Sequence, residues 1–206
     1  MKVELLAITP DAEKLIEKAG RTCYLSFDKV NEESHKRFVR MLIKSGHESV
    51  LEHAYATFRI TGGSRAFTHQ IVRHRLCAFS QQSQRYVDEK GFSIITPPSI
   101  ERNEEAKRIF DDFIKGAKDA YVKLQSLGIK KEDARFVLPN AVESEIVISA
   151  NFREWRHILR ERCGKSAQWE IREVALEMLR ILKRHAQTVF EDFEIDEVER
   201  TLIGSY

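Results

Sequence analysis

Cysteine is scarce in this chain, which carries Cys23, Cys77 and Cys163 and no others among its 206 residues. An odd number of widely spaced cysteines argues against a disulfide framework and against a Cys-x-x-Cys metal site, and it is typical of the reducing cytoplasm. Long apolar runs are also missing, since no stretch approaches the roughly 20 residues of a membrane span. The N-terminus lacks the basic and then apolar layout of a signal peptide. We therefore expect a cytoplasmic protein without a membrane partner.

The chain also carries little net charge. The 34 basic and 32 acidic residues leave a formal charge of +2, which argues against bulk affinity for nucleic acid or acidic membranes. The chain also has no Gly-x-Gly-x-x-Gly segment and so lacks the fingerprint of a dinucleotide-binding doubly wound fold. Any dinucleotide bound here would need a different kind of site.

The apolar patterns predict an α+β fold in a single domain over residues 1–206. Strands are expected at about 2–8, 54–60, 92–95 and 145–150, and helices at about 10–18, 31–44, 103–127, 151–163 and 167–189. Because these elements are interspersed without regular βαβ units, we expect a small, mostly antiparallel sheet with several long helices.

Acidic residues are missing from one local stretch, between Ile60 and Val87, although acids and bases are mixed elsewhere. The stretch instead holds four arginines and two histidines, namely Arg65, Arg73, Arg75, Arg85, His69 and His74. Neutral hydrogen-bonding side chains accompany them: Gln70, Gln81, Gln82, Ser83 and Gln84. Guanidinium groups without carboxylates suit phosphate, and the neutral groups can read a planar polar ring. This inventory predicts a nucleotide site.

Helix geometry adds detail to this stretch. Ser64 is placed to cap a helix whose apolar residues follow the three-to-four spacing, and residues 77–86 after it are expected to form a loop. On that helix Gln70, Arg73 and His74 share a face, whereas Arg75 points away from Arg73. The divergence suggests two anionic ligands at one helix end. The alternative is that these arginines lie on a solvated face or cap the last carbonyls of the helix. This alternative explains any single arginine better than it explains the whole set.

Four segments resemble the flavin-dependent thymidylate synthases. The first is His47-Glu48-Ser49-Val50-Leu51-Glu52-His53, and the second is Arg73-His74-Arg75 followed after seven residues by Ser83-x-Arg85. The third is Arg135-Phe136-Val137-Leu138-Pro139, and the fourth joins Asn151-Phe152-Arg153, His157 and Arg162 to Ala167-Gln168-Trp169-Glu170. The segments occur in order over about residues 47 to 171, and the chain is therefore identified as a member of this family.

The resemblance implies an FAD-dependent methyltransferase. Such an enzyme converts dUMP to dTMP, takes the one-carbon unit from 5,10-methylenetetrahydrofolate, and oxidises NADH or NADPH through the flavin. It also implies a homotetramer whose active sites are shared between subunits. In such a site the cofactor carries the redox chemistry, while the protein supplies orientation and fixed positive charge.

The resemblance also implies roles for individual residues. The predicted flavin contacts are Ser49, Arg73, His74, Arg75, Gln81, Asn151, Phe152, Arg153 and His157. The predicted dUMP contacts are Gln70, Arg73, Gln81, Gln82, Ser83, Gln84, Arg85, Arg135 and Arg162. Ser83 and Arg85 are assigned to the nucleotide phosphate. Arg162 is the predicted catalytic group, because a permanent cation at the uracil edge stabilises negative charge that develops as C5 becomes nucleophilic.

Two other classes of protein remain as alternatives. A single-stranded nucleic-acid-binding module could use the Arg73–Arg85 segment with Phe79 and Tyr86 as stacking platforms, but the chain has no second basic stripe. A zinc hydrolase could use the histidines and glutamates of residues 47–53. Their order, His-Glu-x-x-x-Glu-His, does not give the His-x-x-x-His spacing that a helix presents to zinc, so we expect no metal.

Overall fold

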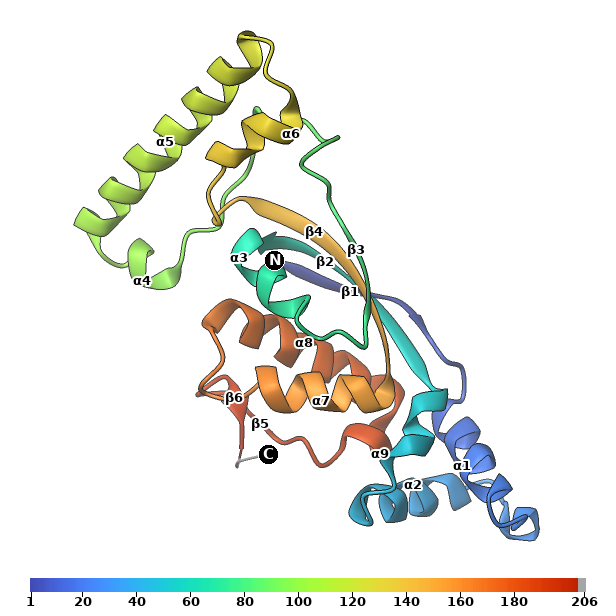
Figure 1. Cartoon of the computed structure of the whole chain (residues 1–206). Coiled ribbons are helices and arrows are strands. Elements are labelled where there is room, and N and C mark those ends of the chain that lie inside the picture. Colours follow the sequence, from blue (N-terminus) through green and yellow to red (C-terminus); the bar gives the residue numbers. More distant parts are fainter. Residues whose placement is uncertain (204–206) are drawn as a thin grey trace. The chain divides into compact units, whose positions relative to one another are not determined.

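The computed structural model describes residues 1–203, and it has the α+β fold with an antiparallel four-stranded sheet that the sequence predicts (Figure 1). The strands are β1 (Lys2–Ile8), β2 (Tyr55–Ser64), β3 (Ala78–Gln81), β4 (Glu143–Asn151), β5 (Ile195–Asp196) and β6 (Thr201–Leu202). The α-helices are α1 (Ala12–Thr22), α2 (Ser34–Lys44), α3 (Arg65–Ile71), α4 (Pro98–Glu101), α5 (Glu104–Ser126), α6 (Lys131–Ala134), α7 (Phe152–Arg162), α8 (Trp169–His185) and α9 (Gln187–Phe190). Short 3₁₀ helices are η1 (Phe27–Lys29), η2 (Glu48–His53) and η3 (Arg135–Val137).

The main sheet has the strand order β1-β2-β4-β3, and β5 pairs with β6 in a separate two-stranded sheet. Strand β4 shows why the sequence forms a strand here: Ser144, Ile146, Ile148 and Ala150 are buried while the residues between them are more exposed, which is the period-two pattern of a strand. Residues 77–86 were expected to be a loop, but Ala78–Gln81 form strand β3 at the sheet edge. An edge strand of four residues carries too short a pattern to be distinguished from a loop.

Contacts divide the described residues into two compact units, each of which has its own packing. Unit 1 comprises residues 1–2, 60–71 and 80–146. Phe92, Ile114 and Val142 form a buried cluster in it, with Ile94 and Phe110 packed around them. Helix α5 supplies Ile114, so its apolar stripe covers this cluster. The prediction of one domain over residues 1–206 stays a prediction.

Helix α5 begins and ends as its sequence dictates. The Asn103 side chain accepts a hydrogen bond from the backbone N–H of Ala106 at 3.0 Å, which satisfies one of the unpaired donors of the first turn. At the other end Gly128 has a φ of 83°, and the N–H groups of Gly128 and Ile129 bond back to Gln125 and Leu124. This pattern is the glycine-dependent Schellman ending.

Unit 2 comprises residues 3–59, 72–79 and 147 onward, and it carries helices α7 and α8, which pack on each other (Figure 1). Its centre is aromatic. Trp155 is fully buried, meets Phe58 edge to face at 5.1 Å, and donates from its indole nitrogen to the carbonyl of Ala56 at 3.1 Å. This contact fixes α7 against strand β2. Within residues 1–203, no helix combines the length and apolar character that crossing a membrane requires.

Candidate functional site

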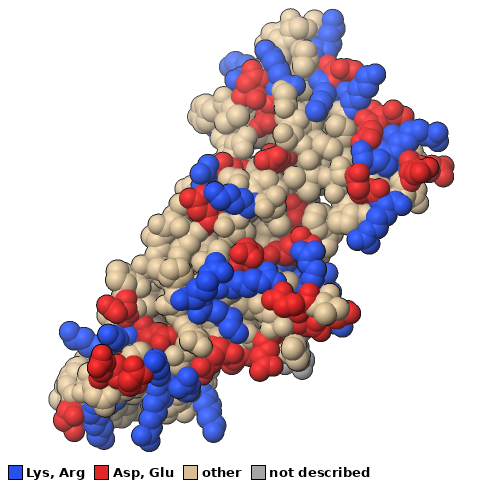
Figure 2. Space-filling view, turned by 180° about the vertical axis from the view of Figure 1, so that it is seen from behind, with Lys and Arg blue, Asp and Glu red and all other residues tan. Residues whose placement is uncertain are grey.

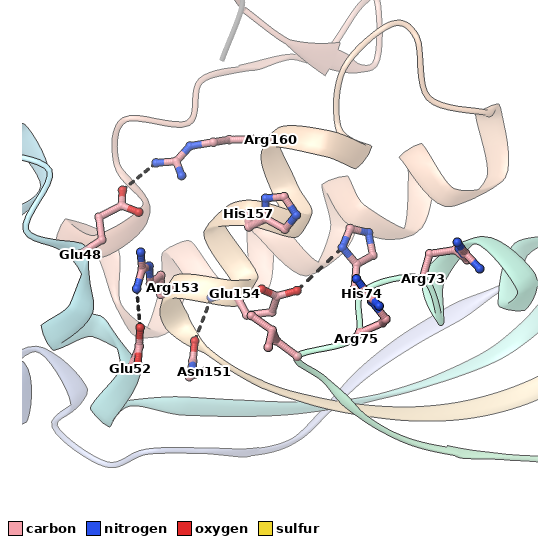
Figure 3. Close-up of a pocket in the computed structure, with 11 residues that line it drawn as sticks. Glu48, Glu52, Arg73, His74, Arg75, Asn151, Arg153, Glu154, His157 and Arg160 are labelled. Carbon is pink, nitrogen blue, oxygen red and sulfur yellow. Dashed lines mark hydrogen bonds and ion pairs between the residues drawn. The ribbon is translucent and has the colours of Figure 1, made fainter.

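A cavity of about 1090 Å³ lies within unit 2 (Figure 3). Three elements that are far apart in the sequence line it: η2, the loop after α3, and helix α7. The lining residues are Glu48 and Glu52 from η2, Arg73, His74, Arg75 and Leu76 from the loop, and Asn151, Arg153, Glu154, His157 and Arg160 around α7. Three of the four segments that carry the family resemblance therefore meet at one cavity.

Helix α7 places its side chains in the cavity because of how it begins. The Asn151 side chain accepts a hydrogen bond from the backbone N–H of Glu154 at 2.8 Å and so caps the helix. The residues that follow at helical spacing, Arg153, His157 and Arg160, lie on the cavity side, whereas Trp155 faces the core. The expected boundary of this helix at Asn151 is confirmed.

The loop after α3 carries the Arg73-His74-Arg75 segment. Ser64 caps α3 as expected, accepting from the N–H of Phe67 at 3.0 Å, but the helix ends at Ile71. The expectation that Arg73 and His74 continue the helix face was therefore wrong. The chain turns after Ile71, and both Arg73 and Arg75 line the same cavity. Because α3 ends before Arg73, the rotation of about 100° per residue in a helix does not apply to Arg73 and Arg75. The expectation that these two side chains point in different directions depended on that rotation.

Two of the four arginines at the cavity are paired with carboxylates. Arg153 donates to Glu52 at 2.6 Å and Arg160 donates to Glu48 at 2.8 Å. Burial opposes ionisation of Glu48, but Arg160 and buried Arg156 together hold the pKa of its carboxyl below the usual value. Among residues 1–203, Arg73 and Arg75 form no ion pair. Their guanidinium groups are the ones that remain for an anionic ligand.

His74 is the buried centre of the site, with 6% of its surface exposed. Its Nε2 accepts a hydrogen bond from Nε of Arg162 at 3.0 Å, and its ring meets that of His157 edge to face at 5.6 Å. Burial above all, and then the charges of Arg162 and His157, lower the pKa of His74 to about 4. The imidazole is therefore neutral at physiological pH, and its proton lies on Nδ1 because Nε2 accepts.

Glu154 and Cys77 also belong to this site, although the sequence did not single out Glu154 and gave Cys77 no role. Oε1 of Glu154 lies 3.9 Å from Nδ1 of His74, and the Cys77 thiol donates to the same oxygen at 4.0 Å. Burial raises the pKa of Glu154 above its usual value despite the opposing charge of His157. Burial likewise raises the pKa of Cys77 to about 12, which keeps the thiol protonated and unreactive.

His74, Glu154 and His157 present ligand atoms within 4.8 Å of one another, the chemistry of a two-histidine, one-carboxylate metal site. The hydrogen bond from Arg162 occupies Nε2 of His74, and the nearby arginines repel a cation. These contacts make the cluster poorly suited to a metal. The prediction that the chain binds no metal stays a prediction.

Several predicted residues lie in unit 1, where their side chains have partners of their own. Gln81 donates to Thr68 at 2.8 Å and to Ser144 at 3.2 Å, and Gln82 donates to Glu89 at 3.1 Å. Arg85 pairs with Glu132 at 3.0 Å. These contacts hold residues 81–85 in place at the end of strand β3, and the Arg85 side chain remains exposed.

The remaining predicted residues differ in their surroundings. Gln70 donates to the carbonyl of Ala66 within α3, Arg135 donates to the carbonyl of Glu132, and Ser83 accepts from the N–H of Arg85. Gln84 lies in the turn after β3, and Ser49 is exposed in η2. As far as residues 1–203 are concerned, none of these lines the cavity of unit 2. Phe152 is fully buried against Phe190 at 5.4 Å, and its predicted flavin contact stays a prediction.

The chain has an α+β fold, and its cavity is lined by arginines around a buried, neutral histidine. These features define an anion-binding site of the kind found in enzymes. The chain matches the family described as Thymidylate synthase complementing protein over residues 4–186. It is 44% identical over 200 residues to a flavin-dependent thymidylate synthase of Geobacter sulfurreducens, covering 93% of this chain and 86% of that protein. It is 42% identical over 208 residues to one of Nitratidesulfovibrio vulgaris, covering 92% and 85%. It is 39% identical over 218 residues to one of Clostridium tetani, covering 93% and 86%.

The chain therefore belongs to the flavin-dependent thymidylate synthase family.

Proposed function

We propose that this chain catalyses the reductive methylation of dUMP to dTMP with FAD as its cofactor. The one-carbon donor is 5,10-methylenetetrahydrofolate and the reductant is NADH or NADPH. One observation supports this most directly: in a chain of this family, the Arg73-His74-Arg75 segment and the N-terminal half of α7 line a single cavity. The nucleic-acid-binding alternative finds no support, since Figure 2 shows acidic side chains interspersed with basic ones over the face it displays.

The residues around the cavity fit a flavin dinucleotide. Its volume of about 1090 Å³ lies slightly above the roughly 300–1,000 Å³ that is typical of small-molecule and cofactor sites, which suits a large ligand. Arg73 and Arg75 supply planar donors for two phosphates. Glu48 and Glu52 carry negative charge at the same cavity, but their pairing with Arg160 and Arg153 neutralises it. Phosphate therefore meets a positively charged wall.

The protein's own part in the reaction is to bind, orient and stabilise charge. The flavin, when bound, supplies the hydride chemistry that links nicotinamide oxidation to completion of the methyl group. Neutral His74 offers hydrogen bonding without adding charge beside the ring system. Arg162, held by His74, supplies the permanent positive charge for the uracil edge, where negative charge grows as C5 attacks the one-carbon unit.

The nucleotide is bound by residues around strand β3 and by Arg135. Ser83 and Arg85 hold the phosphate, and Arg85 exchanges its ion pair with Glu132 for the nucleotide. The remaining proposed dUMP contacts are Gln70, Arg73, Gln81, Gln82, Gln84, Arg135 and Arg162. Four copies of this one-domain chain form a homotetramer, in which residues of different subunits complete each site. The cytoplasm supplies the reduced nicotinamide and folate on which the reaction depends.

Flavin binding by the purified protein tests this proposal. We expect the yellow absorption of bound FAD, either as isolated or after reconstitution. Arg75→Ala should weaken FAD binding by roughly ten- to a hundredfold, because a charge-assisted contact contributes about 1.5–3 kcal/mol. Arg108→Ala, which removes an exposed arginine of helix α5, is the matched control and should bind FAD like the wild type. A protein that takes up no flavin under any of these conditions would refute the proposal.

A further inference from the structure

Glu154 places a carboxyl group in a cavity that suits anionic ligands, and the proposed reaction assigns no role to it. It is buried, with 5% of its surface exposed, and its carboxylate points toward His74 (Figure 3). Burying a carboxyl without a cationic partner costs free energy, so a reason for its presence is needed. Its contacts with His74, and through His74 with Arg162, indicate such a reason.

The hydrogen bond between Arg162 and His74 depends on which nitrogen of the imidazole carries the proton. The Nε–H of Arg162 can only donate, so Nε2 of His74 has to present a lone pair. In a neutral imidazole the proton then lies on Nδ1, and Nδ1 is the atom that faces Oε1 of Glu154 at 3.9 Å. This separation is too long for a direct hydrogen bond, and the carboxylate therefore acts through its charge on the N–H dipole.

We propose that Glu154 is a positioning residue, whose carboxylate selects the Nδ1–H form of His74 and thereby keeps the Nε2 lone pair available to hold the Arg162 guanidinium. The role of Arg162 at the uracil edge rests on the proposed function, whereas the Glu154–His74–Arg162 chain of contacts does not. Without the carboxylate, the proton of His74 distributes between its two nitrogens, and Arg162 loses its acceptor for part of the time.

Capping of helix α7 is the ordinary role for a glutamate at this position. Glu154 is the third residue of α7, where a glutamate often turns back to the start of its helix. Here Asn151 provides the cap, and the Glu154 carboxylate is directed at the loop after α3 instead. A glutamine in place of Glu154 retains helix propensity and shape, removes the charge, and replaces one carboxylate oxygen with an amide donor.

Protonation of Glu154 is the event that ends this positioning. His74 and Cys77 contact its carboxyl, and His157 acts on it through its charge. The other charged and titratable groups that line the same cavity are Arg73 and Arg75 from the loop, Arg153 and Arg160 from α7, and Glu48 and Glu52 from η2. Burial raises the pKa of Glu154 above its usual 4.5, whereas the pKa of His74 is about 4. As the pH falls, protonation of Glu154 removes the charge that selects the Nδ1–H form of His74, and Arg162 loses its acceptor for part of the time.

Histidine NMR on the full chain, with and without FAD, tests the proposal directly. In wild type labelled with ¹⁵N-histidine, His74 should show a protonated Nδ1 and a bare Nε2, and the Nε–H of Arg162 should exchange slowly with solvent. In Glu154→Gln the two nitrogens of His74 should average, and the Nε–H of Arg162 should exchange faster. Glu154→Asp, which keeps the charge, should retain the wild-type pattern in part.

Kinetics supply the second measurement. Glu154→Gln should lower kcat for dTMP formation by about tenfold, less than the hundred- to thousandfold loss typical when a direct electrostatic donor is removed. The KM for dUMP should change little, and the part of the fall of kcat at acid pH that follows protonation of Glu154 should disappear. Glu161→Gln is the matched control, because Glu161 is an exposed residue of the same helix, and it should behave like the wild type.

Unchanged His74 and Arg162 signals in a folded Glu154→Gln variant would overturn the proposal. So would a fall of kcat at acid pH that is the same in that variant as in the wild type. If the wild type shows the expected NMR pattern but makes no dTMP, the proposed function fails and the positioning role of Glu154 stands.

Discussion

At the scale of single residues, His74 shows how burial selects a protonation state. Arg162 and His157 both oppose a positive charge on this ring, and burial opposes it more strongly still. In the unfolded chain the same histidine would gain a proton near its ordinary pKa of 6.5. The folded protein therefore binds fewer protons than the unfolded chain at pH values between about 4 and 6.5.

This difference predicts a pH-dependent loss of stability that originates at His74. Stability contributed by the neutral ring is fully present above about pH 6.5 and falls as the pH drops toward 4, by about 2–3 kcal/mol between about pH 7 and pH 4.5. Urea unfolding of wild type and of His74→Gln at these two pH values measures it. The variant should lose less stability than wild type, and equal losses would contradict the assigned protonation state.

Arg162 is the residue on which the chemistry of dTMP formation depends in this account. Arg162→Lys keeps the charge but loses the planar fork, and Arg162→Ala loses both. Flavin reduction by the nicotinamide should persist in both variants. Formation of dTMP should fall, by on the order of a hundred- to a thousandfold in the alanine variant, because the removed group acts on charge that develops in the transition state.

Separate measurement of the two half-reactions under saturating dUMP provides the check. Wild-type turnover by Arg162→Ala at saturation would show that this arginine only binds the nucleotide.

At the scale of elements, helix α7 begins at a residue that has a structural role and for which we propose a binding role. Asn151 caps the helix through its side-chain oxygen and also lines the cavity. Asn151→Ala should lower the free energy of unfolding by about 1 kcal/mol, within the roughly 0.5–2 kcal/mol range for lost caps. Asn151→Asp keeps a capping oxygen and should retain stability, but it adds negative charge to the cavity that Arg73 and Arg75 also line, and it should weaken FAD binding.

Unfolding curves and FAD titrations of both variants separate the two tasks. Equal FAD affinity in wild type and Asn151→Asp would show that Asn151 is a cap and nothing more.

Long elements with strong patterns could be predicted from the sequence. Helix α5 was expected at residues 103–127 and spans Glu104–Ser126, because its apolar stripe, its Asn103 cap and Gly128 all agree. Strand β3 and the end of α3 at Ile71 were not predicted, since short elements depend on neighbours that are distant in the sequence.

Part of the candidate site could also be predicted from the sequence, and part of it could not. Nine residues were predicted as flavin contacts, and six of them line one cavity: Arg73, His74, Arg75, Asn151, Arg153 and His157. The other three, Ser49, Gln81 and Phe152, are not among the residues that line it. Glu154 was missed because nothing in its local spacing distinguishes it from a solvated helix carboxylate. Only the approach of the loop after α3 shows that it faces His74.

At the scale of the whole molecule, a nearly neutral chain contains one stretch of sequence with several basic residues and no acidic one. Its 34 basic and 32 acidic residues are otherwise mixed, as the face in Figure 2 shows. Arg73 and Arg75 follow from the stretch between Ile60 and Val87 that has no acidic residue. A small anionic ligand is therefore favoured over a polymer such as nucleic acid, which needs an extended basic surface.

The most direct test of the central claim is dTMP formation by the purified chain. The assay combines dUMP, methylenetetrahydrofolate, NADH or NADPH, and FAD, and it measures dTMP by chromatography. We expect dTMP formation that requires all four components, is lost when FAD is removed, and is regained when FAD is returned. A protein that binds FAD and whose FAD is reduced by the nicotinamide, yet which yields no dTMP in the complete mixture, would contradict the proposed function.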